Sequence, residues 1–294
     1  MSSQEKTGRC VIFRGVRGSY PVPGANTLKY GGNTPCLEVK TGRKNFLLDA
    51  GTGITTSDVN TYYAAGVEKA AREQQPELNI LLTHLHWDHI MGLPYFQPLY
   101  NSRLKINIYA LSDLLTGLQK LFQDPFFPLN VEEAAAELNF CQLEAHSSLR
   151  LVGETVVETF PGGHFTDSLI YKVRWESVDK SFVYLGDFEH DYTAHEFSKQ
   201  DLQHFIAGTD LLIYDAHFLQ EEYLGEGEHP GRQGWGHSTW QEGMDLTRRA
   251  EVKKLAFFHH APTRSDEEID EMLKKAREKF SDCFAAREGR RYCL

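Results

Sequence analysis

The sequence contains few cysteines, and their spacing does not indicate that they act in pairs. Its 294 residues include only five, and none is spaced as Cys-x-x-Cys. A disulfide framework or a zinc knuckle would need regular pairs, so the odd count disfavours both. We therefore expect five reduced packing residues, at Cys10, Cys36, Cys141, Cys283 and Cys293.

Long hydrophobic runs are also missing. No apolar stretch is long enough to cross a bilayer. The first residues, Met1 to Lys6, are polar and lack the apolar segment of a secretion signal. We therefore expect a cytoplasmic protein with no membrane partner.

The chain has fewer positively charged than negatively charged residues. The chain has 31 Lys and Arg against 41 Asp and Glu, which gives a net charge of −10. Binding along a phosphate backbone needs clustered Lys and Arg, so we do not expect long nucleic acid as a partner. A small anionic substrate stays compatible with this balance, because bound metal cations would dominate the local field.

Short apolar runs are present throughout, and most of them end in glycine or a polar residue. They predict strands near residues 10–13, 36–39, 45–49, 78–82, 105–109, 155–160, 169–173, 182–185, 211–214 and 255–258. Helices are expected at about 55–74, near 112–122, and from Ser238 and Ser265 onward. This order predicts sheet layers covered by helices, with the active groups at strand ends.

The chain shows no internal repeat and no convincing linker, which predicts one domain over residues 1–294. Residues 94–139 differ in composition, since aromatic residues and prolines are dense there. That segment is either a helical cover on the sheet or a lid beside the active site.

One motif holds four potential metal ligands within six positions. The run His84-x-His86-x-Asp88-His89 follows the apolar strand that ends near Leu82. Imidazole and carboxylate suit zinc and similar divalent ions, and Asp88 can also hold or deprotonate a metal-bound water. In this context the motif predicts a metal centre rather than a merely polar turn.

Further polar residues stand where later strands should end. Any one of them alone is more often an ordinary loop residue, but successive strand ends meet at one edge of a layered fold. We therefore expect these residues to gather around one crevice: His164, Asp187, Asp215, His217, His237, His259 and His260.

In this order the motifs resemble the metallo-β-lactamase fold superfamily. The residues that carry the resemblance are Leu47-Leu-Asp-Ala-Gly-Thr-Gly, the histidine motif, His164, Leu185-Gly-Asp187 and His259. The Gly236-His237-Ser238-Thr239 segment is similar to the phosphodiesterase branch, which includes ribonuclease Z and cyclic phosphodiesterases like PhnP. The resemblance implies an α/β fold, a four-layered αββα sandwich.

The resemblance also implies two metal sites. One ion would be held by His84, His86 and His164, and the other by Asp88, His89 and His259, with His260 as the alternative to His259. Asp187 would bridge the two ions, because a carboxylate has two oxygens. Zinc is the expected cofactor, with manganese or iron as alternatives.

Two such ions, roughly 3.5–4 Å apart, can generate a bridging hydroxide and clamp the oxygens of a displacement at phosphorus. His237 would protonate the leaving oxygen as general acid, and Asp215 would orient His237. Asp49 is expected to support the metal loop from behind. His217 is a further candidate for a contact with the side chains that would hold the metal ions.

The leading functional hypothesis is a di-metal phosphodiesterase acting on a small molecule, a cyclic nucleotide or other cyclic phosphate. The alternatives are a nuclease for short RNA, DNA or tRNA 3′ ends, and a metal-bound sensor without turnover. Related tRNA nucleases carry a long basic arm between the positions of His164 and Asp187, where this chain has only about twenty residues. Similar proteins are often dimers, so a homodimer is a further expectation.

Overall fold

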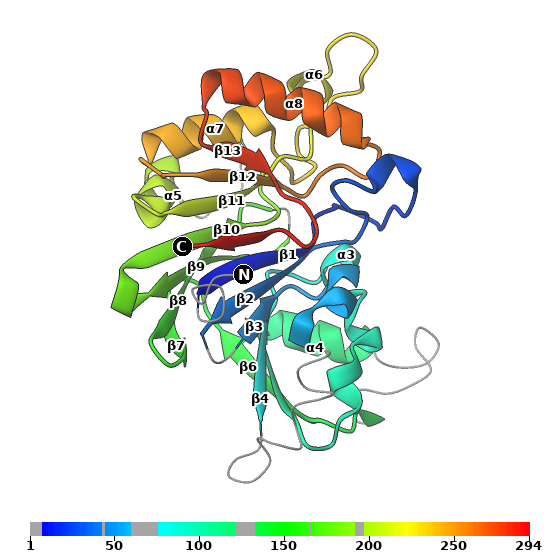
Figure 1. The fold of residues 1–294 in the computed structure, drawn as a ribbon, viewed down its shortest axis with the longest axis vertical. Helices are drawn as coiled ribbons and strands as arrows, with labels where there is room; N and C mark the ends of the chain where they lie inside the picture. Colours follow the sequence, from blue (N-terminus) through cyan, green and yellow to red (C-terminus); the bar gives the residue numbers. More distant parts are fainter. Residues whose placement is uncertain (1–7, 43–44, 60–75, 122–132, 165, 192–196) are drawn as a thin grey trace.

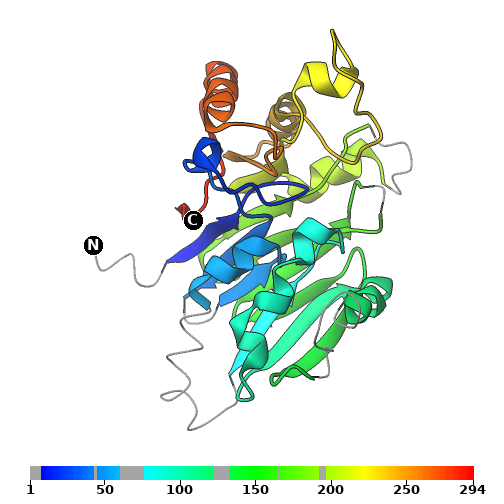
Figure 2. The same ribbon diagram turned by 90° about the vertical axis from the view of Figure 1, so that its right-hand side faces the viewer.

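Two seven-stranded β-sheets face one another in the computed structural model, with helices on the outer side of each (Figures 1 and 2). The structure describes residues 8–42, 45–59, 76–121, 133–164, 166–191 and 197–294. Each sheet has an antiparallel part and a parallel part. Parallel neighbours need long crossovers, which place the helices on the outer faces.

The strands run in a simple order across each sheet. The first sheet consists of β14 (Arg291–Cys293), β1 (Arg9–Gly15), β2 (Cys36–Thr41), β3 (Asn45–Leu48), β4 (Glu77–Leu81), β5 (Lys105–Leu111) and β6 (Glu137–Leu143). The second consists of β13 (Cys283–Ala285), β12 (Leu255–Phe258), β11 (Leu211–Asp215), β10 (Lys180–Leu185), β9 (Leu169–Trp175), β8 (Thr155–Pro161) and β7 (Ser148–Val152).

Helices and 3₁₀ turns connect the strands. In the described part of the chain the α-helices are α3 (Trp87–Ile90), α4 (Ser112–Leu121), α5 (Lys199–Ile206), α6 (Gln220–Leu224), α7 (Trp240–Arg249) and α8 (Asp266–Lys279). The 3₁₀ turns are η2 (Ala25–Thr27), η3 (Thr52–Thr56), η4 (Leu93–Tyr95), η5 (Gln97–Tyr100) and η7 (Glu176–Val178). Helix α8 begins with the predicted capping box, in which the Ser265 hydroxyl accepts from the backbone of Glu268.

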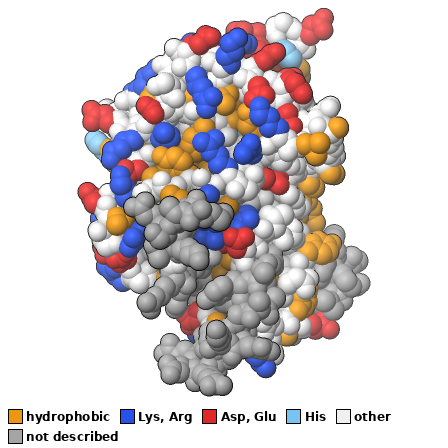
Figure 3. All heavy atoms as spheres, viewed as in Figure 1, with side chains coloured by type: hydrophobic (Ala, Val, Ile, Leu, Met, Phe, Trp, Pro, Cys, Tyr) orange, Lys and Arg blue, Asp and Glu red, His pale blue; other side chains and the backbone are white. Residues whose placement is uncertain are grey.

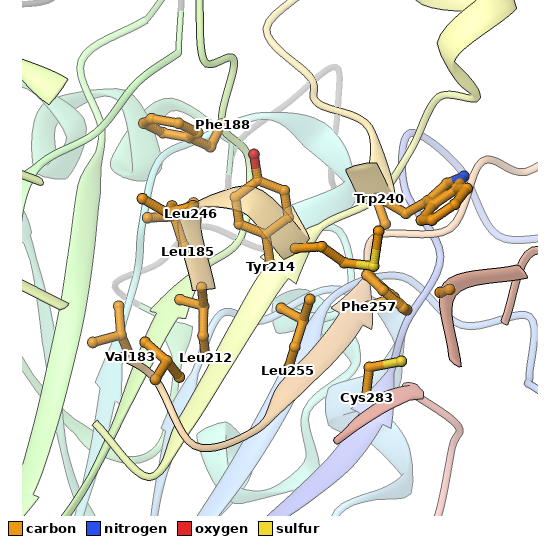
Figure 4. Close-up of a cluster of buried hydrophobic side chains, with 14 of the residues drawn as sticks. Val183, Leu185, Phe188, Leu212, Tyr214, Trp240, Leu246, Leu255, Phe257 and Cys283 are labelled. Atoms are coloured by element: carbon orange, nitrogen blue, oxygen red, sulfur yellow. The ribbon is translucent and has the colours of Figure 1, made fainter. Parts of the chain in front are cut away.

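Three hydrophobic clusters hold the layers together. The central one lies between the sheets and includes Phe13, Leu48 and Phe258. A second packs the outer face of the second sheet under α5, α7 and α8 (Figure 4). A third packs the first sheet under α3 and α4. The layers are therefore helix, sheet, sheet and helix, which confirms the predicted αββα sandwich.

The strand ends explain where the site lies. Strand β11 is apolar and buried over its first four residues, as expected of a strand covered on both faces, and it ends in the carboxylate of Asp215. Its parallel neighbours β10 and β12 end just before Asp187 and His259. In the first sheet, β3 ends before Asp49 and β4 just before the histidine motif. The candidate site residues thus follow the carboxyl ends of parallel strands.

The expectation for the cysteines was wrong for two of the five. Cys10 and Cys293 form a disulfide between directly opposed positions of β1 and β14. The 283 residues that separate them along the chain hide this pairing from the sequence. Cys36, Cys141 and Cys283 are free. Disulfides are rare in reducing compartments, so the cytoplasmic location stays a prediction that this bond does not support.

Some elements differ from the prediction or lie outside the described residues. The predicted helix at about 55–74 lies mostly outside the described residues, which resume at Pro76. Strands β6, β7, β13 and β14 and helices α5 and α6 were not predicted. In the 94–139 segment, β5, α4 and β6 belong to the first sheet and its helical cover. The lid hypothesis and the single-domain assignment stay predictions.

Charges of both signs are mixed on the surface. Lys and Arg side chains lie among Asp and Glu side chains over the upper half of the face in Figure 3. Among the described residues, none of the helices combines the length and apolar character needed to cross a membrane.

Candidate metal centre and active site

The histidine motif spans a strand end and the start of a helix. His84 follows β4, and His86 is the extended residue that precedes α3. Asp88 and His89 lie on α3 itself, so the expected loop is helical in its second half. The rings of His84 and His89 are buried, with centroids 4.2 Å apart.

The fold brings three distant residues to this motif. His164 follows β8, Asp187 follows β10 and His259 follows β12. Nε2 of His164 lies 3.0 Å from Nδ1 of His86. Their donor atoms form two groups in which all lie within 4.8 Å of one another: His84, His86, His164 and Asp187, and Asp88, His89, Asp187 and His259. A third group of this kind, Asp215, His217, His237 and His259, shares only His259 with them.

Asp187 belongs to both groups. Its Oδ1 lies 3.0 Å from Nε2 of His89 and 3.1 Å from Nε2 of His259. Its Oδ2 lies 3.7 Å from Nε2 of His84. One carboxylate therefore presents a separate oxygen to each group.

These residues suit divalent cations. Nε2 of His84, Nε2 of His89 and Oδ1 of Asp187 are buried, and none of them makes a hydrogen bond of normal geometry to a described residue, although the last two atoms lie 3.0 Å apart. Burying polar atoms without partners costs free energy, so such atoms need another source of compensation. The donors are imidazole nitrogens and carboxylate oxygens, the set that zinc, manganese and iron accept. The donor set therefore fits the two ions expected from the sequence.

Asp49 supports the motif as expected. It is fully buried and adopts a positive φ of 60°. Its Oδ1 accepts a 2.8 Å hydrogen bond from the backbone N–H of Thr83, and its Oδ2 lies 2.8 Å from Nδ1 of His89. The Tyr184 hydroxyl donates to the same Oδ2 at 2.8 Å. Such bonds fix the His89 ring so that Nε2 faces the cluster.

The structure distinguishes the two adjacent histidines after β12. Nε2 of His259 lies 3.2 Å from Oδ2 of Asp88, inside the cluster. Nε2 of His260 instead donates to the carbonyl of Ala286 at 3.0 Å, outside it. Burial lowers the pKa of His260 to about 3, which agrees with a neutral ring inside the fold.

His237 lies beside the cluster on Asp215. Its Nδ1 is 2.8 Å from Oδ2 of Asp215 and 3.9 Å from Oδ2 of Asp187. Burial opposes protonation of His237, but the carboxylates of Asp215, Asp187 and Asp88 together outweigh it and raise the pKa of His237 to about 9. Burial in turn raises the pKa of Asp215, against the effect of His237. The pair therefore holds a proton next to the metal-ligand cluster.

His217 lies directly behind this pair. Its Nδ1–H donates to the His259 carbonyl at 3.1 Å, and its ring stacks on His237 with centroids 4.4 Å apart. Burial lowers the pKa of His217 well below the usual value, so the ring is neutral. Gly18 keeps this region open, because a Cβ there would lie 2.5 Å from the His259 ring and 2.8 Å from the His217 ring.

Protonation of the cluster itself depends on its burial. Burial lowers the pKa of His164 to about 4 and the pKa of His84 well below its usual value. Burial also opposes protonation of His89, but Asp187 and Asp88 raise its pKa. A cation would replace that proton, since metal ligation needs the neutral imidazole.

Two residues that position the site were not predicted from the sequence. Glu189 is buried, and its Oε1 accepts from the Tyr223 hydroxyl at 2.9 Å and the Gly234 N–H at 2.6 Å. Its Oε2 accepts from the Gly236 N–H at 2.8 Å. The Ser19 N–H donates to Oδ2 of Asp88 at 2.7 Å. The Asp187-x-Glu189 spacing was the available signal for Glu189, whereas nothing in the sequence marks Ser19.

An open cavity of about 890 Å³ gives access to the cluster. Its wall includes Asp88, His164, Asp187 and His237. None of the described residues of the 94–139 segment lines it. Two groups of metal ligands, a positioned proton donor and a substrate-sized cavity define a metal-dependent hydrolase.

The comparisons with known proteins agree with this class. Residues 44–260 match the family model described as the Beta-lactamase superfamily domain. The chain therefore belongs to the beta-lactamase superfamily, as the sequence predicts, and it is a metal-dependent hydrolase.

Named relatives span the whole chain. A ribonuclease Z of Thermococcus sibiricus is 25% identical over 97% of this chain and 98% of its own length. A solved diphosphatase from the PhnP family has a TM-score of 0.65 and 19% identity, covering 97% of this chain and 99% of that one. Zn²⁺-bound PqqB from Methylobacterium extorquens has a TM-score of 0.66 and 17% identity, covering 97% and 100%.

Proposed function

We propose that the protein hydrolyses a phosphodiester bond in a small molecule, a cyclic nucleotide or other cyclic phosphate. The observation that carries the proposal is the position of His237, which lies 3.9 Å from Asp187 and is paired with the buried Asp215. A protonated imidazole beside two metal sites suits a reaction that generates an alkoxide leaving group.

The proposed ligands follow the two groups described above. His84, His86 and His164 would hold one cation and Asp88, His89 and His259 the other, with Asp187 shared between them. When bound, two such ions supply a nucleophilic oxygen at neutral pH and neutralise charge that develops on phosphorus. Zinc is the preferred ion for this donor set, with manganese or iron as alternatives.

The chain's own residues would do three things. Asp49 holds the His89 ring through Nδ1, so that Nε2 stays aimed at the cluster. Asp215 holds Nδ1 of His237, which leaves Nε2 of His237 to deliver its proton to the leaving oxygen. Asp88 is fixed by the Ser19 N–H, and could assist in deprotonating the attacking water.

Nuclease action on short RNA, DNA or tRNA 3′ ends is the second candidate. It is favoured by the relative named ribonuclease Z, which matches nearly the full chain. The interval between His164 and Asp187 does not resemble a long basic arm, because its described residues form mainly the β9–β10 hairpin with its short η7 turn. A metal-bound sensor without turnover is the third candidate, but a binding module has no need of a proton donor.

Metal analysis and substrate assays test the proposal. The purified protein should contain two divalent ions per chain and cleave bis(p-nitrophenyl) phosphate. A panel of cyclic nucleotides and other cyclic phosphates should then be cleaved in preference to a 3′-extended tRNA. Absence of turnover by zinc-, manganese- and iron-loaded protein would favour the sensor, and preference for tRNA the nuclease. The homodimer and the cytoplasmic location stay expectations that size and fractionation measurements would test.

A further inference from the structure

The wall of the cavity combines exposed aromatic rings with few aliphatic side chains. Tyr20, Trp87 and Trp235 line it, and these residues are 50%, 53% and 54% exposed. Among the described residues that line it, the aliphatic contribution is limited to Ala261 and two prolines, and none is Leu, Ile, Val or Met. Such a surface suits a flat π system and not an acyl chain.

Each exposed ring belongs to a residue that is close in sequence to the metal-ligand groups, to His237, or to a residue that contacts a ligand. Trp87 stands between His86 and Asp88 at the start of α3. Trp235 precedes His237 by two residues. Tyr20 follows Ser19, whose N–H holds Asp88. Because short backbone links join these rings to the cluster, a phosphodiester at the cluster would have its organic groups within their reach.

Trp235 is held in place from one side. The guanidinium of Arg232 lies over its ring, 4.4 Å from the centroid, and the backbone N–H of Trp235 donates to the Arg232 carbonyl at 3.2 Å. Glu189 holds the flanking amides of Gly234 and Gly236. The indole is therefore braced by a cation while more than half of it stays exposed, which favours stacking of a further ring.

Charge limits the size of the ligand. Arg232 contributes the one Lys or Arg side chain among the described residues that line the cavity. Proteins that grip a polynucleotide need several cations along its backbone. Glu222 and Arg264, near the same cavity, neutralise each other through an ion pair of 2.5 Å. The wall thus offers stacking surfaces for a base but little for a chain of phosphates.

We propose that this cavity is a nucleobase site, in which Trp87 and Trp235 stack on the base of a mononucleotide phosphodiester. The proposal rests on the phosphodiesterase function proposed above and names its substrate class as nucleoside cyclic monophosphates. The base sits on the indoles while the phosphate meets the ligand cluster.

The kinetic test uses the metal-loaded enzyme with two substrates. Adenosine cyclic monophosphate carries a base, and glycerol cyclic phosphate does not. Replacing Trp235 or Trp87 with Ala should lower kcat/KM for the adenosine substrate roughly tenfold or more and leave the glycerol substrate unchanged. Trp235→Phe should recover much of the loss. Tyr95→Ala is the matched control, since Tyr95 is 63% exposed but lies outside the cavity wall.

Indole fluorescence gives a readout that does not need turnover. Of the four tryptophans, Trp175 and Trp240 are buried, so Trp87 and Trp235 are the ones that a ligand in the cavity can reach. Adenosine monophosphate should quench the wild-type emission, and glycerol phosphate should not. In the Trp87→Phe/Trp235→Phe double variant, the quenching should disappear.

The outcomes separate this proposal from the function on which it rests. The nucleobase site would be overturned if the enzyme hydrolysed both substrates equally well and the tryptophan variants slowed both alike or neither. The proposed phosphodiesterase function would be unaffected by that result. Quenching that persists in the double variant would overturn it too. Failure to cleave any phosphodiester would reject the proposed function, while the quenching experiment would still decide whether a base binds.

Discussion

Nδ1 of His237 lies 2.8 Å from Oδ2 of Asp215, a carboxylate with no exposed surface. The second oxygen of Asp215 accepts from the backbone N–H of His217 at 2.9 Å, so the carboxylate is fixed from both sides. Asp215 ends β11, which ties the orientation of His237 to the second sheet. The proton donor is therefore positioned by the fold and not by the substrate.

Replacing His237 with Ala should remove proton donation and leave metal binding intact. His237 belongs to neither of the two groups that share Asp187, so metal content should stay at the wild-type level. Turnover should fall on the order of 100-fold or more, the usual loss for a general acid. Metal analysis and steady-state kinetics on a cyclic phosphate check both points. Unchanged turnover would remove His237 from the mechanism.

Replacing Asp215 with Asn should change the pH profile. His237 acts as an acid only while protonated, so activity is lost as pH rises through its pKa, which Asp215, with Asp187 and Asp88, raises to about 9. Without the carboxylate the pKa of His237 falls, and the alkaline limb of kcat should move to lower pH. A profile between pH 6 and about 10 on a substrate that needs leaving-group protonation tests this. A limb that stays in place would assign it to another group.

The chemistry of the site could be predicted because it lies in short runs of sequence. The motif from His84 to His89 is contiguous, and Asp187 and His259 follow recognisable apolar strands. Strand ends in parallel sheets meet at one edge, so these side chains had to converge. The choice between His259 and His260 needed coordinates, because only the backbone path after β12 decides which ring enters the cluster.

What the sequence did not predict depends on distant partners. Ser19 contacts Asp88 through a backbone N–H, so its side chain carries no signal. Strands β1 and β14 pair across nearly the whole chain, which is why the Cys10–Cys293 bond was missed. Strand β7 alternates between half-buried and exposed residues at a sheet edge, so it lacks a strong apolar run. Long-range pairing is set by the tertiary fold rather than by local pattern.

Replacing Asp187 with Asn should release metal. Its two oxygens face different ligand groups, and an amide offers one oxygen without the charge. Elemental analysis after dialysis should find less than full occupancy at both positions. Asp245→Asn, an exposed change on α7, is the control and should keep both ions. Two ions per chain in the Asp187 variant would show that this carboxylate is not shared.

Reduction of the Cys10–Cys293 bond should lower thermal stability. The bond closes almost the entire chain into one loop, so opening it enlarges the unfolded ensemble and costs roughly 2–4 kcal/mol. The Tm of oxidised protein should fall when a thiol reductant is added. The Cys10→Ser/Cys293→Ser variant should melt at the lower temperature with or without reductant. Cys141→Ser is the control, because Cys141 is free and half-buried.

Replacing Glu189 with Gln should loosen the segment that carries Trp235 and His237. The carboxylate accepts three hydrogen bonds, from Tyr223, Gly234 and Gly236, and an amide can replace only part of them. The Gly236 carbonyl also lies 2.9 Å from Nδ1 of His164, so a shift there would reach the metal ligands.

For Glu189→Gln we expect kcat to fall about 10-fold or more with metal content retained, and Glu189→Ala to lose metal as well. The contrasting control is Tyr223→Phe, which removes one donor but leaves the carboxylate bound to both glycine amides, and should retain most of the activity. If Glu189→Ala matched the wild type in both kcat and metal content, the segment would be held by its remaining contacts. Glu189 would then have no positioning role.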